Sequence, residues 1–369
     1  MKAESDSGSP GSANATIKEV ARMAGVSVAT VSRVLNAKGP VREETRSRIL
    51  AAVESLRYSP HGAARSLTTN QTDTLGVLLP DIYGEFFSEL IRGIDSAARR
   101  QGYHILVSGS HNDREEATAV LRALRGRVDG LILMAPSADA LEALRAHLPE
   151  ALPTVLLNAP AQDLPFDSIE VDNCGGAYAM TRHLVRLGHR RIAFIQGPAD
   201  NHDARERLRG YREAIRDLGA VIAPELEIPG DFGEEDGSRA GARLLSLHPR
   251  PTAVFAANDG MAIGCLYALR QAGARVPEEI ALAGFDDIPV ARFMSPPLTS
   301  VGVPIAELGA LALERLLAAV RDESAHRPRH QTLPATLRVR GSCGAGQPSD
   351  PEGHPSMTDS DSRQGGLAR

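Results

Sequence analysis

Short apolar runs alternate with amphipathic stretches of helix length from residue 75 to about residue 341, and no other feature constrains the fold as strongly. The runs include LGVLLP, HILVSG, GLILMA and TVLLNA, followed by RIAFIQG, TAVFAAND and IALAGFDD. Strands that are apolar along their whole length are typical of parallel sheets with helices on both faces. This alternation of strands and helices over about 270 residues exceeds what one sheet comfortably holds. We therefore predict two doubly wound parallel-sheet α/β subdomains.

Residues 16–60 show a different pattern, that of three short helices. Thr16 and Glu19 have the spacing of a capping box, so a helix should begin at Ile17 and end near Gly25. Ser27 can cap a second helix. Apolar residues at helical spacing mark the inward faces of the second and third helices: Val28, Val31 and Val34 or Leu35, then Ile49, Val53 and Leu56. Two helices joined by AGVS and followed by a third predict an all-α helix-turn-helix domain, and a surface bundle of capped helices is the alternative.

Charge is distributed unevenly along the chain. The formal net charge is -5, yet residues 16–72 hold nine Lys or Arg against four Glu and therefore carry +5. The part of the chain from residue 73 onward carries about -9. A basic head on an acidic body indicates that only the head meets a polyanion such as DNA.

The second helix of a helix-turn-helix enters the major groove with its N-terminal residues against base edges. Here Val28 and Ala29 can contact thymine methyl groups, and Arg33 can bind guanine O6 and N7 with two hydrogen bonds. Short hydroxyl and amide side chains suit phosphate contacts, which set the register on DNA. The candidates for these contacts are Ser27, Thr30, Ser32 and Asn36.

No apolar run approaches the roughly eighteen residues of a membrane span, and the polar start lacks the apolar core of a signal peptide. We therefore expect a cytoplasmic protein without membrane contact. Cys174, Cys265 and Cys343 lie far apart in the sequence, which predicts free thiols and no metal site. Residues 1–15 and 342–369 have little apolar content, so both are expected to be disordered tails.

The residues described so far carry a resemblance to a known family. TIKEVARMAGVSVATVSRVLN, followed by VREETRSRILAAVESLRYSPHGAARSLTT, resembles the N-terminus of the LacI/GalR family of bacterial transcription repressors. The likeness continues more loosely to residue 341 through VDNCGGAY, LGHRRIAFI, RLRGY, AGFDD and LPATLRVRGS. It implies a homodimer on a pseudo-palindromic operator, and a body like periplasmic sugar-binding proteins with an effector between its two subdomains.

The resemblance also implies the order of domains. It gives a DNA-binding domain at 16–60, a hinge helix and linker at 61–72, and a core at 73–341. Within the core, the N-subdomain would comprise about 73–172 and 303–330, and the C-subdomain about 173–302 and 331–341.

In this family a hinge helix forms on operator DNA, and a leucine from each subunit enters the minor groove at a central CpG step. The matching segment is GAARSL, so Leu67 would be that wedge, and unstacking one base step is offset by contacts that the bent DNA allows. Tyr58 and Ser59 would lie near phosphates, although Tyr58 equally suits the core. Arg65 is a further candidate for DNA contact.

Polar residues recur where apolar strand runs end, which is where open α/β sheets bind ligands. Asp81, Asn158, Asn258 and Asp286 occupy such positions, and they are either ligand contacts or helix caps, a cap being the expectation for Asp259. The resemblance assigns effector binding to Arg207, in RERLRGY.

Arg207 and Asp286 would together suit a sugar, because the guanidinium donates to hydroxyl groups and the carboxylate accepts from them. Phe86 and Phe232 offer apolar faces or core packing. Positions that contact purines in one branch of the family hold Asn201 and Asp203 here, which argues against a nucleobase effector.

The sequence argues against other classes of function. It contains no phosphate-binding P-loop, no G-x-S-x-G, no H-E-x-x-H and no Cys/His cluster, so we expect neither an enzyme nor a cofactor. A solute-binding protein without DNA function would share the body but not the head. Within the regulators, a sugar-induced repressor is favoured over a corepressor-dependent one or one controlled by a partner protein.

Overall fold

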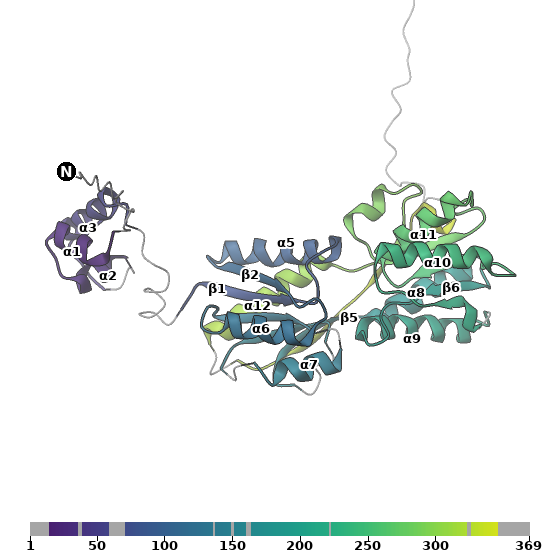
Figure 1. Cartoon of the computed structure of the whole chain (residues 1–369), viewed down its shortest axis with the longest axis horizontal. Coiled ribbons are helices and arrows are strands. Elements are labelled where there is room, and N and C mark those ends of the chain that lie inside the picture. The colour runs from purple at the N-terminus through teal and green to yellow at the C-terminus, as the bar shows by residue number, and fades with distance from the viewer. Residues whose placement is uncertain are drawn as a thin grey trace, which may run out of the picture. The chain divides into compact units, whose positions relative to one another are not determined.

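The computed structural model describes residues 15–35, 39–58, 71–135, 137–148, 151–159, 164–220, 223–322 and 326–345. The chain divides into two compact units, a head up to Thr74 that includes the loop 127–129, and a body formed by the remainder. The head contains three helices: α1 (Ile17–Ala24), α2 (Val28–Leu35) and α3 (Glu43–Ser55) (Figure 1).

The predicted caps of the head helices are present. The Thr16 hydroxyl accepts from the backbone N–H of Glu19, and the Glu19 carboxylate accepts from the Thr16 backbone N–H at 2.7 Å, which completes the capping box. Gly25 ends α1 in the left-handed conformation with φ 64°, where a side chain would be strained. Ser27 accepts from the Thr30 backbone N–H at 3.2 Å and so caps α2.

The head has its own apolar core. Its buried members are Val20, Ala21, Ala24, Val31, Val34, Ile49 and Ala52. The expectation that Val28 faces inward is wrong, because its side chain is 40% exposed. Val31 and Val34 define the inward face of α2, and Val28 in the first turn lies beside that face rather than on it.

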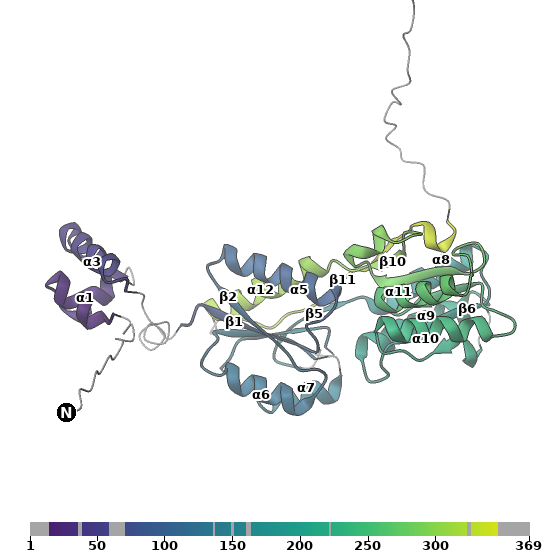
Figure 2. The ribbon, with the colours of Figure 1, turned by 45° about the horizontal axis from the view of Figure 1, so that its top comes forward.

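The body contains two sheets, as predicted, and each has six strands. The first has the order β11-β5-β4-β3-β1-β2, and its pairs are parallel where their register is given. Its strands are β1 (Thr74–Leu79), β2 (His104–Gly109), β3 (Gly130–Met134), β4 (Thr154–Leu157), β5 (Asp167–Val171) and β11 (His330–Leu333). Figure 2 shows α5 (Glu85–Arg100) and α12 (Ile305–Arg321) on one face, with α6 (Arg114–Leu124) and α7 (Ala138–Arg145) on the other. We call this layer system the first subdomain.

The second sheet has the order β12-β10-β9-β8-β6-β7, and only β12 among its described pairs runs antiparallel to its neighbour. Its strands are β6 (Ile192–Ile195), β7 (Glu227–Ile228), β8 (Ala253–Ala256), β9 (Ala281–Asp286), β10 (Thr299–Gly302) and β12 (Thr336–Arg338). Its helices are α8 (Asn173–Arg186), α9 (His202–Asp217), α10 (Glu234–Ser246) and α11 (Asp259–Gln271), with the short helices η1 (Pro224–Leu226), η2 (Pro289–Phe293) and η3 (Gly341–Cys343). Helix α8 packs on α9, and α10 packs on α11. We call this the second subdomain.

Three crossovers join the subdomains, after β5, after β10 and after β11. The third comes after Leu333, because β11 pairs with β5 throughout its length; the boundary near residue 330 that the sequence indicated is therefore a few residues too early. No helix among the described residues is long and apolar enough to cross a membrane. The three cysteines are free thiols, as predicted.

The C-terminal end of the body lies later than predicted. Ser342 and Cys343, placed in a disordered tail by the sequence, are fully buried. The Ser342 hydroxyl donates to the Leu282 carbonyl at 2.6 Å and accepts from the Thr299 backbone N–H at 2.8 Å. A small polar residue does not signal burial by composition, but here it satisfies backbone groups at the edge of the second sheet.

Candidate functional site

A cavity of about 470 Å³ lies between the two subdomains, and we call it the cleft. All seven residues that the sequence predicted to bind an effector line it: Asp81, Phe86, Asn158, Arg207, Phe232, Asn258 and Asp286. The volume falls within the range of about 300–1,000 Å³ typical of small-molecule sites. The sequence therefore identified residues that the fold brings together from widely separated segments.

The topology explains why these residues meet. Asn158 follows β4 in the first subdomain, Asn258 follows β8 in the second, and Asp286 ends β9. Because β1 and β4 in the first sheet and β8 and β9 in the second run parallel to their neighbours, their carboxyl ends form one edge of each sheet, and that edge borders the cleft. Asp81 follows β1 at the same edge, where its carboxylate also accepts from the backbone N–H groups of Ile82 and Tyr83.

Arg207 is the centre of the second subdomain's wall and is only 4% exposed. Its Nε donates to Asn173 Oδ1 at 2.8 Å, and its Nη1 donates to the Ala257 carbonyl at 2.6 Å. Its Nη2 lies 3.0 Å from Asp286 Oδ1, which forms a buried ion pair. The guanidinium also lies over the Phe285 ring, with 3.8 Å from Cζ to the ring centroid. These contacts fix the guanidinium in one orientation before any ligand arrives.

Strained backbone is concentrated at the cleft. Asn158, Phe232 and Asp286 have positive φ angles of 45°, 65° and 105°, and Asp287 follows with 54°. Residues with side chains rarely adopt this region, and each such case costs of the order of 1–3 kcal/mol. Strain of this kind persists where the surrounding structure fixes it, which is common at binding sites.

Two carboxylates of the cleft have raised pKa values. Burial raises the pKa of Asp286 to about 6, against the lowering effect of the Arg207 charge. Burial likewise raises the pKa of Asp203 to about 6, with Arg207 and His202 lowering it and the charge of Glu170 raising it. At neutral pH both carboxyl groups are mainly ionised, although their burial opposes the charge.

Asp259 neither caps a helix nor faces the cleft. Asn258 caps α11 instead, because its Oδ1 accepts from the Met261 backbone N–H at 2.9 Å. The fully buried Asp259 accepts from the Ile288 backbone N–H at 2.9 Å and from the Ser300 hydroxyl at 2.7 Å. The expected cap at Asp259 is therefore wrong: the carboxylate joins α11 to the segments after β9 and within β10.

The structure places the two predicted aromatic residues both at the cleft and against the core. Phe86 and Phe232 line the cleft, and both also pack against the apolar core of the body. Phe86 meets Phe87 edge to face, with 5.4 Å between ring centroids. Aromatic faces at the border of a polar cleft suit the C–H faces of a ring-shaped polyol.

Two further residues belong to the wall of the cleft: Asp203 lines the cavity, and Asn173 lies behind it, bonded to Asp203 and Arg207. Asn173 begins α8 one residue after β5, next to the N-cap Asp172, so the rule that selected Asn158 points to this pair of residues. Asp203 lies one turn before Arg207 on α9, and its Oδ1 accepts from Asn173 Nδ2 at 3.0 Å. Asp203 and Arg207 are four residues apart on a helix, so they share a face, and this spacing could have predicted that Asp203 lies beside Arg207. Asn201, grouped with Asp203 by sequence, caps α9 through the Ala204 backbone N–H and also lines the cleft.

The head presents the predicted DNA-contacting residues on α2 and its N-cap. Ser27, Val28, Ala29 and Arg33 are exposed, and Thr30 and Ser32 are half-buried. Tyr58 is half-buried and packs against the head core, in line with the alternative noted for it. Four further candidates lie outside the described residues: Asn36, Ser59, Arg65 and Leu67.

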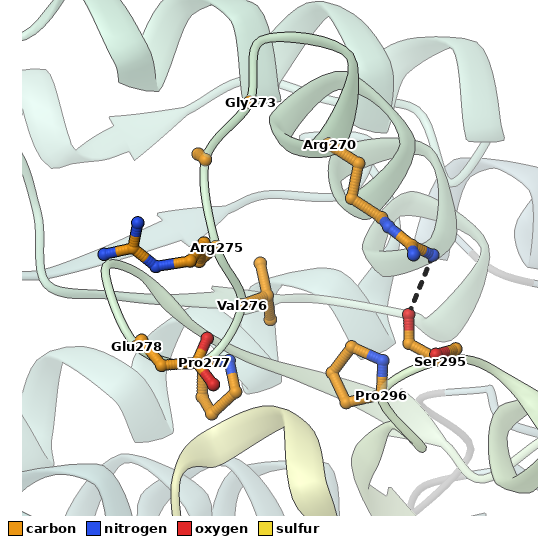
Figure 3. A pocket seen from close by; sticks show the side chains of 9 residues that line it. Arg270, Gly273, Arg275, Val276, Pro277, Glu278, Ser295 and Pro296 are labelled. Atoms are coloured by element: carbon orange, nitrogen blue, oxygen red, sulfur yellow. Dashed lines mark hydrogen bonds between the residues drawn. The ribbon is translucent and has the colours of Figure 1, made fainter.

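A second hollow of about 440 Å³ lies in the second subdomain and has a different character (Figure 3). Arg270 donates to the Ser295 carbonyl at 2.9 Å, and Arg275 pairs with Glu279 at 2.9 Å, so both guanidinium groups there have protein partners. None of the predicted effector residues lines it. Among the described residues, no group of three or more His, Cys, Asp or Glu side chains is arranged to hold a metal ion.

Two family models match the chain. One, for bacterial regulatory proteins of the lacI family, matches residues 16–61. The other, a periplasmic binding protein-like domain, matches residues 181–343. The two matches therefore fall on the head and on the body, mainly its second subdomain.

Similar proteins extend over nearly the whole chain. The ribose operon repressor of Escherichia coli (strain K12) is 39% identical over 334 residues, which cover 89% of this chain and 99% of that protein. The HTH-type transcriptional repressor PurR of Aliivibrio fischeri (strain ATCC 700601 / ES114) is 38% identical, covering 85% of this chain and 94% of its own length. A lac repressor dimer solved with operator and the anti-inducer ONPF has a TM-score of 0.81 and 31% identity, covering 90% of this chain and 99% of that chain.

Proposed function

The chain belongs to the LacI family of bacterial regulatory proteins, and we propose that it is a repressor released from its operator by a sugar-like effector in the cleft. The observation that carries this proposal is the Arg207–Asp286 ion pair at the border of two subdomains. The names of the similar proteins support it, since they include a ribose operon repressor. As a repressor of bacterial transcription, the protein would act in the cytoplasm, where the DNA is.

Recognition of DNA is assigned to the exposed face of α2. Its Arg33 would read a guanine, while Val28 and Ala29 would contact thymine methyl groups. The net positive charge of residues 16–72 supplies the attraction to phosphate that does not depend on base sequence. The hinge role of Leu67 at a central CpG step completes this proposal.

Dimerisation is assigned to strand β2, which ends the first sheet. Leu106 and Val107 on β2 are 44% and 37% exposed, and Ile82 and Tyr83 near β1 are also exposed. An exposed apolar edge strand favours association, and a second copy of the chain is the partner that a two-fold symmetric operator requires. The homodimer would bind two half-sites of a pseudo-palindrome.

Two residues that line the cleft, Arg207 and Asp286, hydrogen-bond to residues at two of the crossovers between subdomains. Asn173, which accepts from Arg207, begins α8 immediately after the crossover strand β5. The Asp286 carbonyl accepts from the Val303 backbone N–H at 3.2 Å, at the crossover from β10 to α12. A ligand that binds Arg207 and Asp286 would therefore act on segments that join the two subdomains.

A further contact joins the subdomains beside the cleft. Glu85, the first residue of α5, accepts from the backbone N–H of Val290 in η2 at 3.0 Å. This contact depends on the relative position of the two subdomains. A ligand that changes the closure of the cleft would alter it and, in the dimer, the spacing of the paired hinge segments.

The test begins by selecting the operator from random DNA with the full-length protein. Candidate sugars, ribose among them, are then titrated against the labelled operator. The effector should weaken operator binding by about 5–150-fold, corresponding to a coupling free energy of about 1–3 kcal/mol. Asp286→Asn should bind operator normally and lose the response, whereas Arg209→Ala, an exposed neighbour on α9, should respond like the wild type.

Two results would contradict the proposal. If Asp286→Asn responds as the wild type does, the cleft is not the effector site. If a ligand that binds the cleft tightens operator binding, the protein is a corepressor-dependent regulator instead. A purine would be the first ligand to try in that case, since a PurR repressor is among the similar proteins.

A further inference from the structure

Buried oxygen acceptors with few donors lie in and near the wall of the cleft. Among the described residues, two buried side-chain oxygens, Asn158 Oδ1 and Glu170 Oε1, have no hydrogen-bond partner, and a third, Asp286 Oδ1, has only its ion pair with Arg207. All three are oxygen acceptors. Asn158 and Asp286 line the cleft, and the charge of Glu170, on the crossover strand β5, acts on Asp203 in its wall. Buried acceptors without donors are costly, so the group that occupies the cleft is expected to be rich in donors.

The charge of the cleft is strongly one-sided. Five aspartates line it, and among the described residues Arg207 is the only lysine or arginine that does so. The aspartates are Asp81, Asp200, Asp203, Asp231 and Asp286. The guanidinium of Arg207 is already engaged by Asn173, the Ala257 carbonyl and Asp286. A phosphate or carboxylate on a ligand would therefore meet carboxylates rather than an available cation.

Asp203 is a partly buried carboxylate of the cleft wall that a ligand can reach. It lines the cleft and is only half-buried, whereas Asp286 is 5% exposed and paired with Arg207. The side chains of Asn173 and Asn158 hydrogen-bond to this carboxylate, and the charged groups that act on it are Arg207 and His202 on α9 and Glu170 on β5. When a ligand fills the cleft, it removes water from Asp203, and a positively charged donor compensates for that loss more fully than a neutral hydroxyl does.

We propose, on the basis of the function assigned above, that the effector carries an ammonium group beside its hydroxyls, as an amino sugar or another polyhydroxylated amine does. Asp203 selects this group by pairing with it. An ammonium group supplies three donors and one positive charge, which matches a wall of acceptors that has an excess of carboxylates. Anionic sugars, including sugar phosphates, are excluded by the same wall.

The test compares matched ligands by calorimetry on the full-length protein at about pH 7. The pairs are glucose with glucosamine, galactose with galactosamine, and ribitol with 1-amino-1-deoxyribitol. N-Acetylglucosamine removes the charge, and glucosamine 6-phosphate adds an anion. In at least one pair the amine should bind about tenfold or more tightly than its neutral partner. The acetylated and phosphorylated forms should lose that advantage.

Asp203→Asn tests the residue itself. The asparagine oxygen still accepts from Asn173, so the fold should be kept, and thermal unfolding checks this directly. The variant should bind the amine and its neutral partner within about twofold of each other. Asp231→Asn is the matched control, because Asp231 lines the same cleft but is exposed and screened by water, and its preference for the amine should persist.

Acid should remove the preference in the wild type. As the pH falls from about 7 to about 5, Asp203 takes up a proton, because its pKa is about 6. The advantage of the amine should then shrink, while Asp203→Asn shows no such change.

The outcomes separate this inference from the function on which it rests. A neutral sugar that binds more tightly than its amine and releases operator would overturn the inference and leave the repressor function intact. Equal preference for the amine in the wild type and Asp203→Asn would overturn the role of Asp203. If no member of any pair binds, both the inference and the assignment of the cleft to sugar-like ligands fail.

Discussion

Replacing Arg207 by methionine should destabilise the body strongly, and the loss should depend on pH. The guanidinium is almost fully buried and makes two hydrogen bonds, one ion pair and a stacking contact. Methionine keeps much of the apolar stem but leaves Asp286 without a counter-charge. Removing one partner of a buried ion pair costs about 3–5 kcal/mol, so we expect a loss of that size at about pH 7.5.

The pH dependence follows from the pKa of Asp286. In the wild type this pKa is already raised to about 6, above that of an unfolded Asp, so the native state binds more protons between about pH 4 and pH 6. Native stability therefore falls as the pH rises through that window. Without Arg207 the pKa of Asp286 rises further, so the pH range in which the native state binds an extra proton extends upward. The variant should therefore recover part of its lost stability at about pH 5.

The assay is urea unfolding of the full-length protein, followed by circular dichroism at about pH 5 and pH 7.5. Arg209→Met is the matched control on the same helix, because Arg209 is exposed and its pairs with Glu206 and Glu213 should contribute less than about 1 kcal/mol. The double variant Arg207→Met with Asp286→Asn should regain most of the lost stability. If Arg207→Met costs no more than Arg209→Met, or if its cost is the same at both pH values, the reasoning is refuted.

Four further perturbations test the head and the couplings. Arg33→Ala should cost about 1–3 kcal/mol of operator binding and relax one base preference in a site selection, whereas Arg46→Ala should weaken all sequences alike. Val107→Asp should lower dimer affinity at least about tenfold, because it places a charge on the exposed edge strand, and sedimentation at micromolar concentration measures this. Glu85→Ala removes the contact with η2, so it should shift effector and operator affinities in opposite directions, as titration of each ligand will show. Leu67→Ala should reduce operator affinity and DNA bending, measured by gel mobility, and leave the thermal unfolding of the body unchanged.

Each of these four predictions has a result that would contradict it. An unchanged selected motif for Arg33→Ala would remove its role in base reading, and a stable dimer of Val107→Asp would place the interface elsewhere. If Glu85→Ala changes the effector affinity and the operator affinity in the same direction, the contact between Glu85 and Val290 does not depend on closure of the cleft. Equal binding of wild type and Leu67→Ala to operators with and without the central CpG step would end the wedge hypothesis.

The architecture could be predicted from the sequence because it follows from patterns of neighbouring residues. Fully apolar strand runs between amphipathic helices determine parallel sheets, and the capping box at Thr16 with Gly25 determines the limits of α1. The residues that line the cleft could be predicted for a related reason. A polar residue at the end of an apolar strand lies at the carboxyl edge of a parallel sheet, so Asn158, Asn258 and Asp286 could be placed together without coordinates.

The roles of individual polar groups were decided only by tertiary structure. Asp259 and Asn258 are adjacent and chemically alike, yet one bridges buried segments and the other caps α11 and lines the cleft. Likewise, Ser342 looks like part of a polar tail but is buried against the second sheet. The physical reason is that local sequence fixes which residues are apolar or able to hydrogen-bond, whereas the partner of each buried polar group comes from segments far away in the chain. Only the folded chain brings Asn173, Asp203 and Arg207 into one network, and the chemistry of the cleft depends on that network.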